Sequence, residues 1–76
     1  MPDLIALQLF WRENDQIHKR DIVPEDWSRD GMKRSLIPHL RELKTREGIE
    51  YYYVVLKARR SDGQLGYRTI IPKTIP

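Results

Sequence analysis

The chain has 76 residues and no cysteine, and its 14 basic and 11 acidic side chains give a net charge of +3. A chain of this length forms one small domain, residues 1–76, with one thin core, so a deep enclosed active site is not expected. The lack of cysteine excludes disulfides, thiolate metal sites and cysteine nucleophiles. No apolar run approaches the roughly 20 residues that cross a bilayer, and the start does not resemble a signal peptide. We therefore expect a cytoplasmic protein without membrane attachment.

The N-terminal segment predicts a β-hairpin. Apolar side chains alternate with others from Leu4 to Arg12, which indicates a strand with one buried face. Residues 13–16, Glu-Asn-Asp-Gln, favour a turn, because Asn and Asp tolerate a left-handed backbone. A second strand is expected from Ile17 to Val23. It has only three apolar residues, which suits an exposed edge where charges discourage further pairing.

The middle of the chain predicts helix. Pro24, Glu25 and Asp26 favour a helix start, because proline fits the first turn and acids favour the positive end of the helix dipole. An apolar stripe at helical period follows: Met32, Leu36, Leu40 and Leu43. Gly48 is the expected C-terminal cap.

Pro38 interrupts this helical pattern. Proline in a helix interior costs about 3 kcal/mol, whereas in a first turn it costs little. Ser35 is able to cap a new helix whose first turn contains Pro38. We therefore expect a break near Arg34–Ser35, with helices over residues 25–33 and 36–47; a single bent helix is the alternative.

The last part predicts a second hairpin. Residues 49–60 include three consecutive tyrosines and then Val-Val-Leu, which is a typical strand composition. Asp62 and Gly63 favour the centre of a two-residue turn. A return strand is expected from Leu65 to Pro72.

This order of elements predicts an α+β domain of ββαββ type. Two β-hairpins form one antiparallel or mixed sheet, and the central, broken helix packs on one face. One possible strand order places the first and last strands side by side in the centre of the sheet.

No constellation in the sequence indicates catalysis. His18 and His39 lie on different predicted elements, without a carboxylate at metal-ligand spacing. No glycine-rich elbow or phosphate loop surrounds any serine. We expect no enzymatic activity, no catalytic residue, no cofactor and no metal site.

The most informative surface is the uncovered face of the predicted sheet. Residues 51–76 carry five basic side chains and only one acidic one, interleaved with tyrosines. Aromatic and basic side chains on an open sheet suit single-stranded nucleic acid, because bases stack on rings and phosphates meet cations. The candidate stacking residues are Phe10, Tyr51 and Tyr53. The candidate phosphate contacts are Arg12, Lys57, Arg59, Arg60 and Arg68.

Two alternatives use the same residues. Tyrosines are common strand residues, and basic side chains often only cover a sheet surface. The second alternative is a small protein-interaction module, such as an adaptor or an inhibitor that docks on a larger protein, because Tyr, Trp and Arg are favoured interface anchors. Trp27 is the candidate hot spot for that role. A homodimer is also possible, because a small domain gains stability by burying an exposed sheet face.

Overall fold

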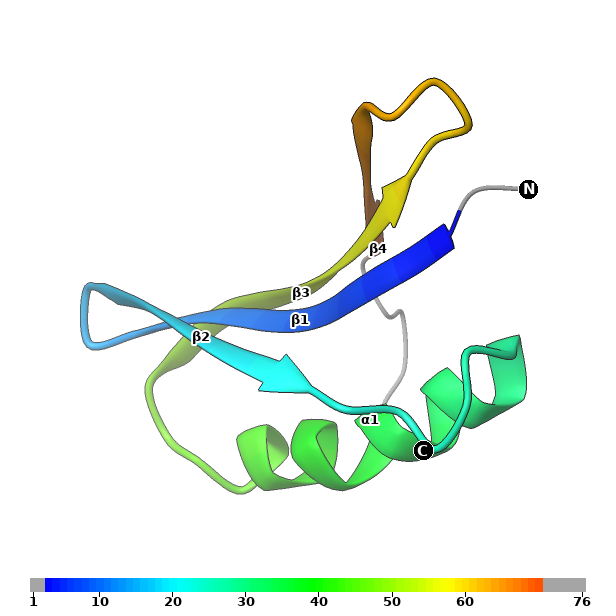
Figure 1. Ribbon diagram of the computed structural model, residues 1–76. Helices are drawn as coiled ribbons and strands as arrows, with labels where there is room; N and C mark the ends of the chain where they lie inside the picture. The colour runs from blue at the N-terminus through cyan, green and yellow to red at the C-terminus, as the bar shows by residue number, and fades with distance from the viewer. Residues whose placement is uncertain (1–2, 71–76) are drawn as a thin grey trace.

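The computed structural model describes residues 3–70 and has the predicted α+β class, with four strands and one helix in ββαββ order. Figure 1 shows the helix below the sheet and the second hairpin rising away from it. The elements are β1 (Asp3–Glu13), β2 (Gln16–Ile22), α1 (Arg29–Lys44), β3 (Ile49–Arg59) and β4 (Leu65–Ile70). Residues 71 and 72 of the predicted last strand lie outside the described residues.

All strand pairs are antiparallel, and the sheet order is β2-β1-β3-β4. The two hairpins therefore join through β1 and β3, the two 11-residue strands. The expectation that the first and last strands pair is wrong, because β4 forms an edge. The apolar faces of β1 and β3 lie together at the centre, where the helix covers them best.

The core lies between this central pair and α1. Leu7, Leu9 and Trp11 alternate along β1 toward the helix, and Val54 joins them from β3. Ile22, Leu40 and Leu43 complete the buried cluster, so the predicted helical stripe does face the sheet. Each fully buried side chain of this size contributes roughly 1.5–3 kcal/mol.

The two hairpin turns differ from each other. Asn14 and Asp15 have φ of 54° and 63° and join a β1–β2 pair that ends at Glu13 and Gln16. This is the predicted turn. The second turn is not the predicted two-residue type: Arg60 N donates to Gln64 O at 2.8 Å, and three residues lie between them. Gly63, with φ of 85°, supplies the left-handed position that a three-residue loop requires.

The predicted break in the helix is wrong, because α1 is continuous from Arg29 to Lys44 with Pro38 inside it. Ser28 is the N-cap, and its Oγ accepts from Gly31 N at 3.0 Å. Ser35 does not cap a new helix. Its Oγ donates to Gly31 O at 2.9 Å and accepts from Glu25 N at 3.0 Å. Pro38 has no N–H to donate to the Arg34 carbonyl. Both residues are exposed, so this carbonyl is able to bind water.

The helix also starts and ends inside the predicted limits. Glu25 and Asp26 precede the helix, and Asp26 accepts hydrogen bonds from the backbone N–H and the hydroxyl of Ser28. At the other end Thr45 is the C-cap and its N–H bonds to Glu42 O at 3.2 Å. Gly48, predicted as the cap, has φ of 88° and belongs instead to the turn into β3.

Candidate functional site

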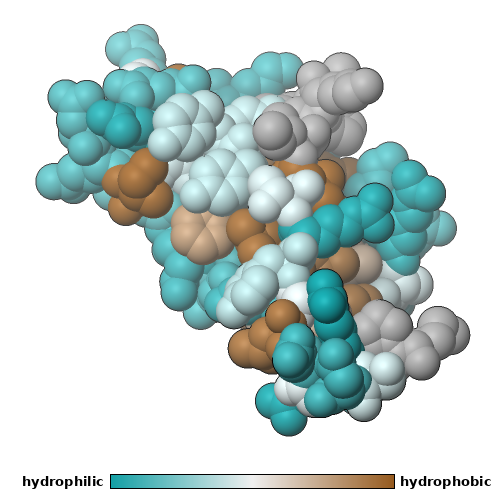
Figure 2. Space-filling model, turned by 90° about the horizontal axis from the view of Figure 1, so that it is seen from above, coloured by the Kyte–Doolittle hydropathy of each residue, from teal (hydrophilic) through white to brown (hydrophobic). Residues whose placement is uncertain are grey.

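The sheet has one face packed on α1 and one face turned away from it, which we call the open face. The β1–β3 register places Phe10 opposite Tyr53, Arg12 opposite Tyr51, and Ala6 opposite Lys57. All the predicted stacking residues therefore lie on the open face. Figure 2 looks onto this face, where pale and brown surface crosses the middle and teal surface flanks it.

Phe10, Tyr53 and Tyr51 form a continuous stack, which we call the aromatic ladder. The rings of Phe10 and Tyr53 are 5.1 Å apart and 5° from parallel, and those of Tyr51 and Tyr53 are 6.3 Å apart and 18° from parallel. Phe10 and Tyr53 stack because cross-strand neighbours on one face lie about 5 Å apart. Tyr51 joins them because it is two residues from Tyr53 on the same face of β3. Tyr53 has a ring on each side, so the outer faces of Phe10 and Tyr51 are the ends of the ladder.

Arg12 lies on the open face, but its charge is compensated. Its Nε is 2.8 Å from a Glu50 carboxylate oxygen, and its Nη2 is 3.6 Å from Asp15. The hydrogen bond with Tyr51 and the negative charge of Glu50 raise the pKa of Arg12. The predicted role of Arg12 as a phosphate contact is weakened, because a phosphate has to compete with two carboxylates.

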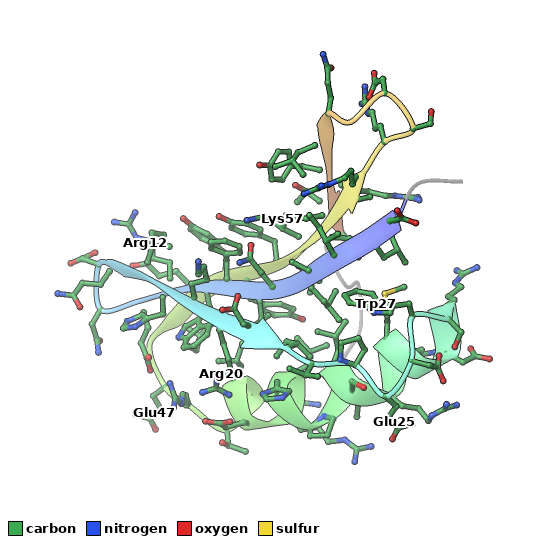
Figure 3. The ribbon with its side chains drawn as sticks, in the orientation of Figure 1. Arg12, Arg20, Glu25, Trp27, Glu47 and Lys57 are labelled. Atoms are coloured by element: carbon green, nitrogen blue, oxygen red, sulfur yellow. The ribbon has the colours of Figure 1, made fainter. Side chains whose placement is uncertain are left out.

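Lys57 lies on the same face without such compensation (Figure 3). Its Nζ is 5.6 Å from the ring centroid of Tyr67, its neighbour on β4, and it has no ion-pair partner within residues 3–70. Lys19 is the β2 neighbour of Phe10 and likewise has no ion-pair partner in the described chain. Sequence reasoning missed Lys19 and Tyr67 as members of the face, because only the strand register places them there.

The other predicted cations are divided between the two faces. Arg59 pairs with Leu65 on the Lys57 side of the sheet. Arg60 begins the adjoining loop, and its side chain lies over Gly66, which pairs with Ala58 on the helix side of the sheet. Arg68 pairs with Leu56 and faces α1, so it lies on the opposite side of the sheet from the aromatic ladder. The structure therefore brings Arg59 near the open face but separates Arg60 and Arg68 from it.

Trp27 also lies away from the ladder. It belongs to the segment before α1 and lies on the helix side of the sheet in Figure 3, with 39% of its surface exposed. Its proposed role as a docking anchor is therefore independent of the open face.

Both histidines contact other side chains of the domain. The His18 ring stacks on Trp11 at 5.3 Å, and His39 Nδ1 is 3.1 Å from Arg20 Nη1. Within residues 3–70, no cluster of His, Asp and Glu has the size and spacing to hold a metal ion. The described helix, α1, is too short and too polar to span a membrane. The chemistry that the open face offers is stacking, hydrogen bonding and ionic attraction.

Comparisons of the chain with protein-family models, curated proteins and solved structures found no match.

Proposed function

We propose that the open face binds single-stranded nucleic acid and catalyses no reaction on it. The observation that carries this proposal is the aromatic ladder, in which the two central strands place three stacked rings opposite the helix. Aromatic rings on an open four-stranded sheet form a platform for unpaired bases, and each stacked base contributes roughly 1–3 kcal/mol. Bases in a duplex already stack on each other, so the ladder favours single strands.

The ends of the ladder determine where a base binds. Tyr53 is covered on both sides, and Tyr51 lies against Arg12. The outer face of Phe10 is therefore the expected position for the first base, which extends the stack toward β2. Lys19, the β2 neighbour of Phe10, is then placed to meet the phosphate of that nucleotide.

The remaining phosphates follow β3 toward the second hairpin. Lys57 and Arg59 are two residues apart on one strand, so their side chains leave the same face about 7 Å apart. The acid in the loop of that hairpin, Asp62, accepts a hydrogen bond from Gln64 N at 3.0 Å. The row supplies ionic attraction without base recognition, so binding should depend steeply on salt.

The test is fluorescence anisotropy with a labelled strand of about ten thymidines at roughly 50 and 200 mM salt. The double variant Lys57→Gln/Arg59→Gln should weaken binding and flatten its salt dependence, because two phosphate contacts are lost. The matched control, Lys33→Gln/Lys44→Gln, removes the same charge from α1 and should leave both quantities nearly unchanged. Equal affinity of the two double variants would refute the phosphate row.

A Phe10→Leu variant tests the stacking separately. It keeps an apolar side chain against Tyr53 but removes the ring on which the first base stacks. We expect about a tenfold loss of affinity with an unchanged salt slope, which corresponds to one stacked base. Wild-type affinity in this variant would remove the ladder from the proposal.

Docking of a protein on the same face is the second candidate. It is favoured by the exposed apolar and aromatic side chains around the ladder, which include Ile17, Tyr51 and Tyr67. Such side chains anchor protein interfaces, as in an adaptor or an inhibitor. This function predicts a stoichiometric protein complex that survives nuclease treatment, together with no binding of the thymidine strand at low salt.

The cysteine-free composition is the ground on which we propose a cytoplasmic location for this activity. A homodimer through the open face would bury the aromatic ladder. Sedimentation of the purified protein with and without the thymidine strand tests this. A dimer that dissociates when the strand binds would place both interactions on the open face.

A further inference from the structure

The helix side of the sheet contains a groove that the open-face proposal does not use. It has a volume of about 610 Å³ and lies between the first half of α1 and the strands β3 and β4. Its floor is apolar and includes Leu7, Val54 and Leu56, while Met32 and Leu36 form the helix wall. A concave apolar site of this size, with a few polar groups at its rim, has the general features of a binding site.

The rim of the groove is positively charged. Arg29 and Lys33 reach it from α1, and Arg68 reaches it from β4. No carboxylate is among its described lining residues, and none of these three cations has an ion-pair partner within residues 3–70. The groove therefore complements a ligand that is both apolar and acidic.

One border of the groove is an edge strand. β4 ends the sheet, and Ile70, on its groove side, is 43% exposed, while Leu65 and Tyr67, on its open-face side, are 47% and 63% exposed. An edge with exposed apolar side chains is a template for pairing with another strand. The opposite edge, β2, has one exposed apolar side chain, Ile17, beside its turn. Its middle is charged, and its Arg20 is 2.8 Å from Glu42 of α1, so β4 is the better template.

We propose that an extended, acidic segment of another protein adds as a fifth strand along the outer edge of β4 and fills the groove. Side chains alternate along a strand, so every second residue of the segment enters the groove beside Arg68 and Ile70. An acidic residue of the segment beside Arg68 would pair with the positive rim, and an apolar residue beside Ile70 would pack on the apolar floor. A second copy of this chain is disfavoured as occupant, because β4 would bring a second uncompensated Arg68.

This inference does not depend on nucleic-acid binding, because it uses the other face of the sheet. Its probe is a labelled seven-residue peptide, TVTETVT, whose two valines and glutamate project from one face when extended. The control peptide, TVTKTVT, replaces the glutamate with lysine. We expect the full-length chain to bind the glutamate peptide about tenfold more tightly, as one charge-assisted contact predicts.

Charge reversal on the protein provides the second arm. Arg68 lies on an exposed strand. Arg68→Glu should invert the preference between the two peptides, so that the lysine peptide binds better. Lys44→Glu makes the same charge change at the far end of α1 and should keep the wild-type preference. Bound peptide should also slow amide hydrogen exchange across residues 65–70, because the edge N–H groups become paired.

Three results would overturn the proposal. The first is equal binding of both peptides to the wild-type chain, or no binding of either. The second is binding without slower exchange in β4, which would mean that the ligand does not add as a strand. The third is binding that appears only after residues 71–76 are removed, which would assign the groove to the chain's own C-terminal residues.

Discussion

The two ends of α1 contact the sheet differently. At the end nearest the β1–β2 turn, which we call the closed end, helix and sheet are in direct contact. At the other end, the open end, the basic groove separates them. Two arginines bridge the closed end: Arg20 of β2 is 2.8 Å from Glu42 of α1, and Arg46, just after α1, is 3.2 Å from Glu13 of β1. Their guanidinium groups lie 5.3 and 5.9 Å from the Trp11 ring centroid. Arg29, Lys33 and Arg68 at the open end have no such partners within residues 3–70.

The difference teaches that net charge alone does not locate a binding surface. Arginines at the closed end hold helix and sheet together, and their charges are paired with carboxylates of the same molecule. The cations of the open end, like Lys57 and Arg59 on the open face, have no ion-pair partner within residues 3–70 and are therefore available to external anions.

The largest expected effect comes from the core of the closed end. Leu43→Ala removes a side chain that is 2% exposed and should lower the free energy of unfolding by about 2–5 kcal/mol. Leu36→Ala, at the groove, is the matched control and should cost about 1 kcal/mol, because Leu36 is only partly buried. Urea denaturation measures both. Equal losses would show that the two ends are equally well packed.

Gly31 tests the start of the helix at the open end. A Cβ added there would lie 2.9 Å from the Asp26 carbonyl oxygen and would also contact the Asp26 carboxylate. Gly31→Ala should therefore destabilise the domain by about 1–3 kcal/mol, although alanine normally favours a helix. Ser28→Ala removes the cap and the hydroxyl bond to Asp26 without adding a clash, and should cost about 1 kcal/mol. A higher thermal midpoint in Gly31→Ala would show that this segment rearranges freely.

The smallest effect is a pH dependence at the closed end. The hydrogen bond and charge of Arg20 lower the pKa of Glu42 from its ordinary value of 4.5. The carboxylate of Glu42 therefore binds a proton more tightly in the unfolded chain than in the folded one. The contribution of the ionised Glu42 to folding stability is present above about pH 4.5 and is lost as pH falls below it. Glu42→Gln should be less stable than wild type at neutral pH, and the difference should narrow at acidic pH. A constant difference between thermal midpoints at pH 7 and pH 3 would contradict this coupling.

The sequence predicted the two faces of the central strands well. Alternation with period two assigns Leu9 and Phe10 to opposite faces whatever the pairing, and the same holds for Val54 and Tyr53. The aromatic ladder could be anticipated as a set of residues for this reason. Its stacking could not, because the distance between Phe10 and Tyr53 depends on the β1–β3 register.

The remaining differences have the same origin in tertiary contacts. Arg12 is a predicted phosphate contact, but the structure places its Nε 2.8 Å from a Glu50 carboxylate oxygen, which the sequence alone does not indicate. Arg68 could not be assigned to the helix side until the pairing of β4 with β3 was known. Pro38 predicts a helix break, but the proline is exposed and α1 continues through it, while Ser35, the predicted cap, bonds to Gly31 O and Glu25 N instead.

The most direct test of the account is a titration of the isotopically labelled full-length chain with the thymidine strand, followed by two-dimensional NMR at about 50 mM salt. The account predicts chemical-shift changes that centre on Phe10, Tyr53, Lys57 and Arg59, with little change along the groove. Changes confined to the groove, at Leu36 and Arg68, or no changes at this salt concentration would contradict the assignment of nucleic-acid binding to the open face.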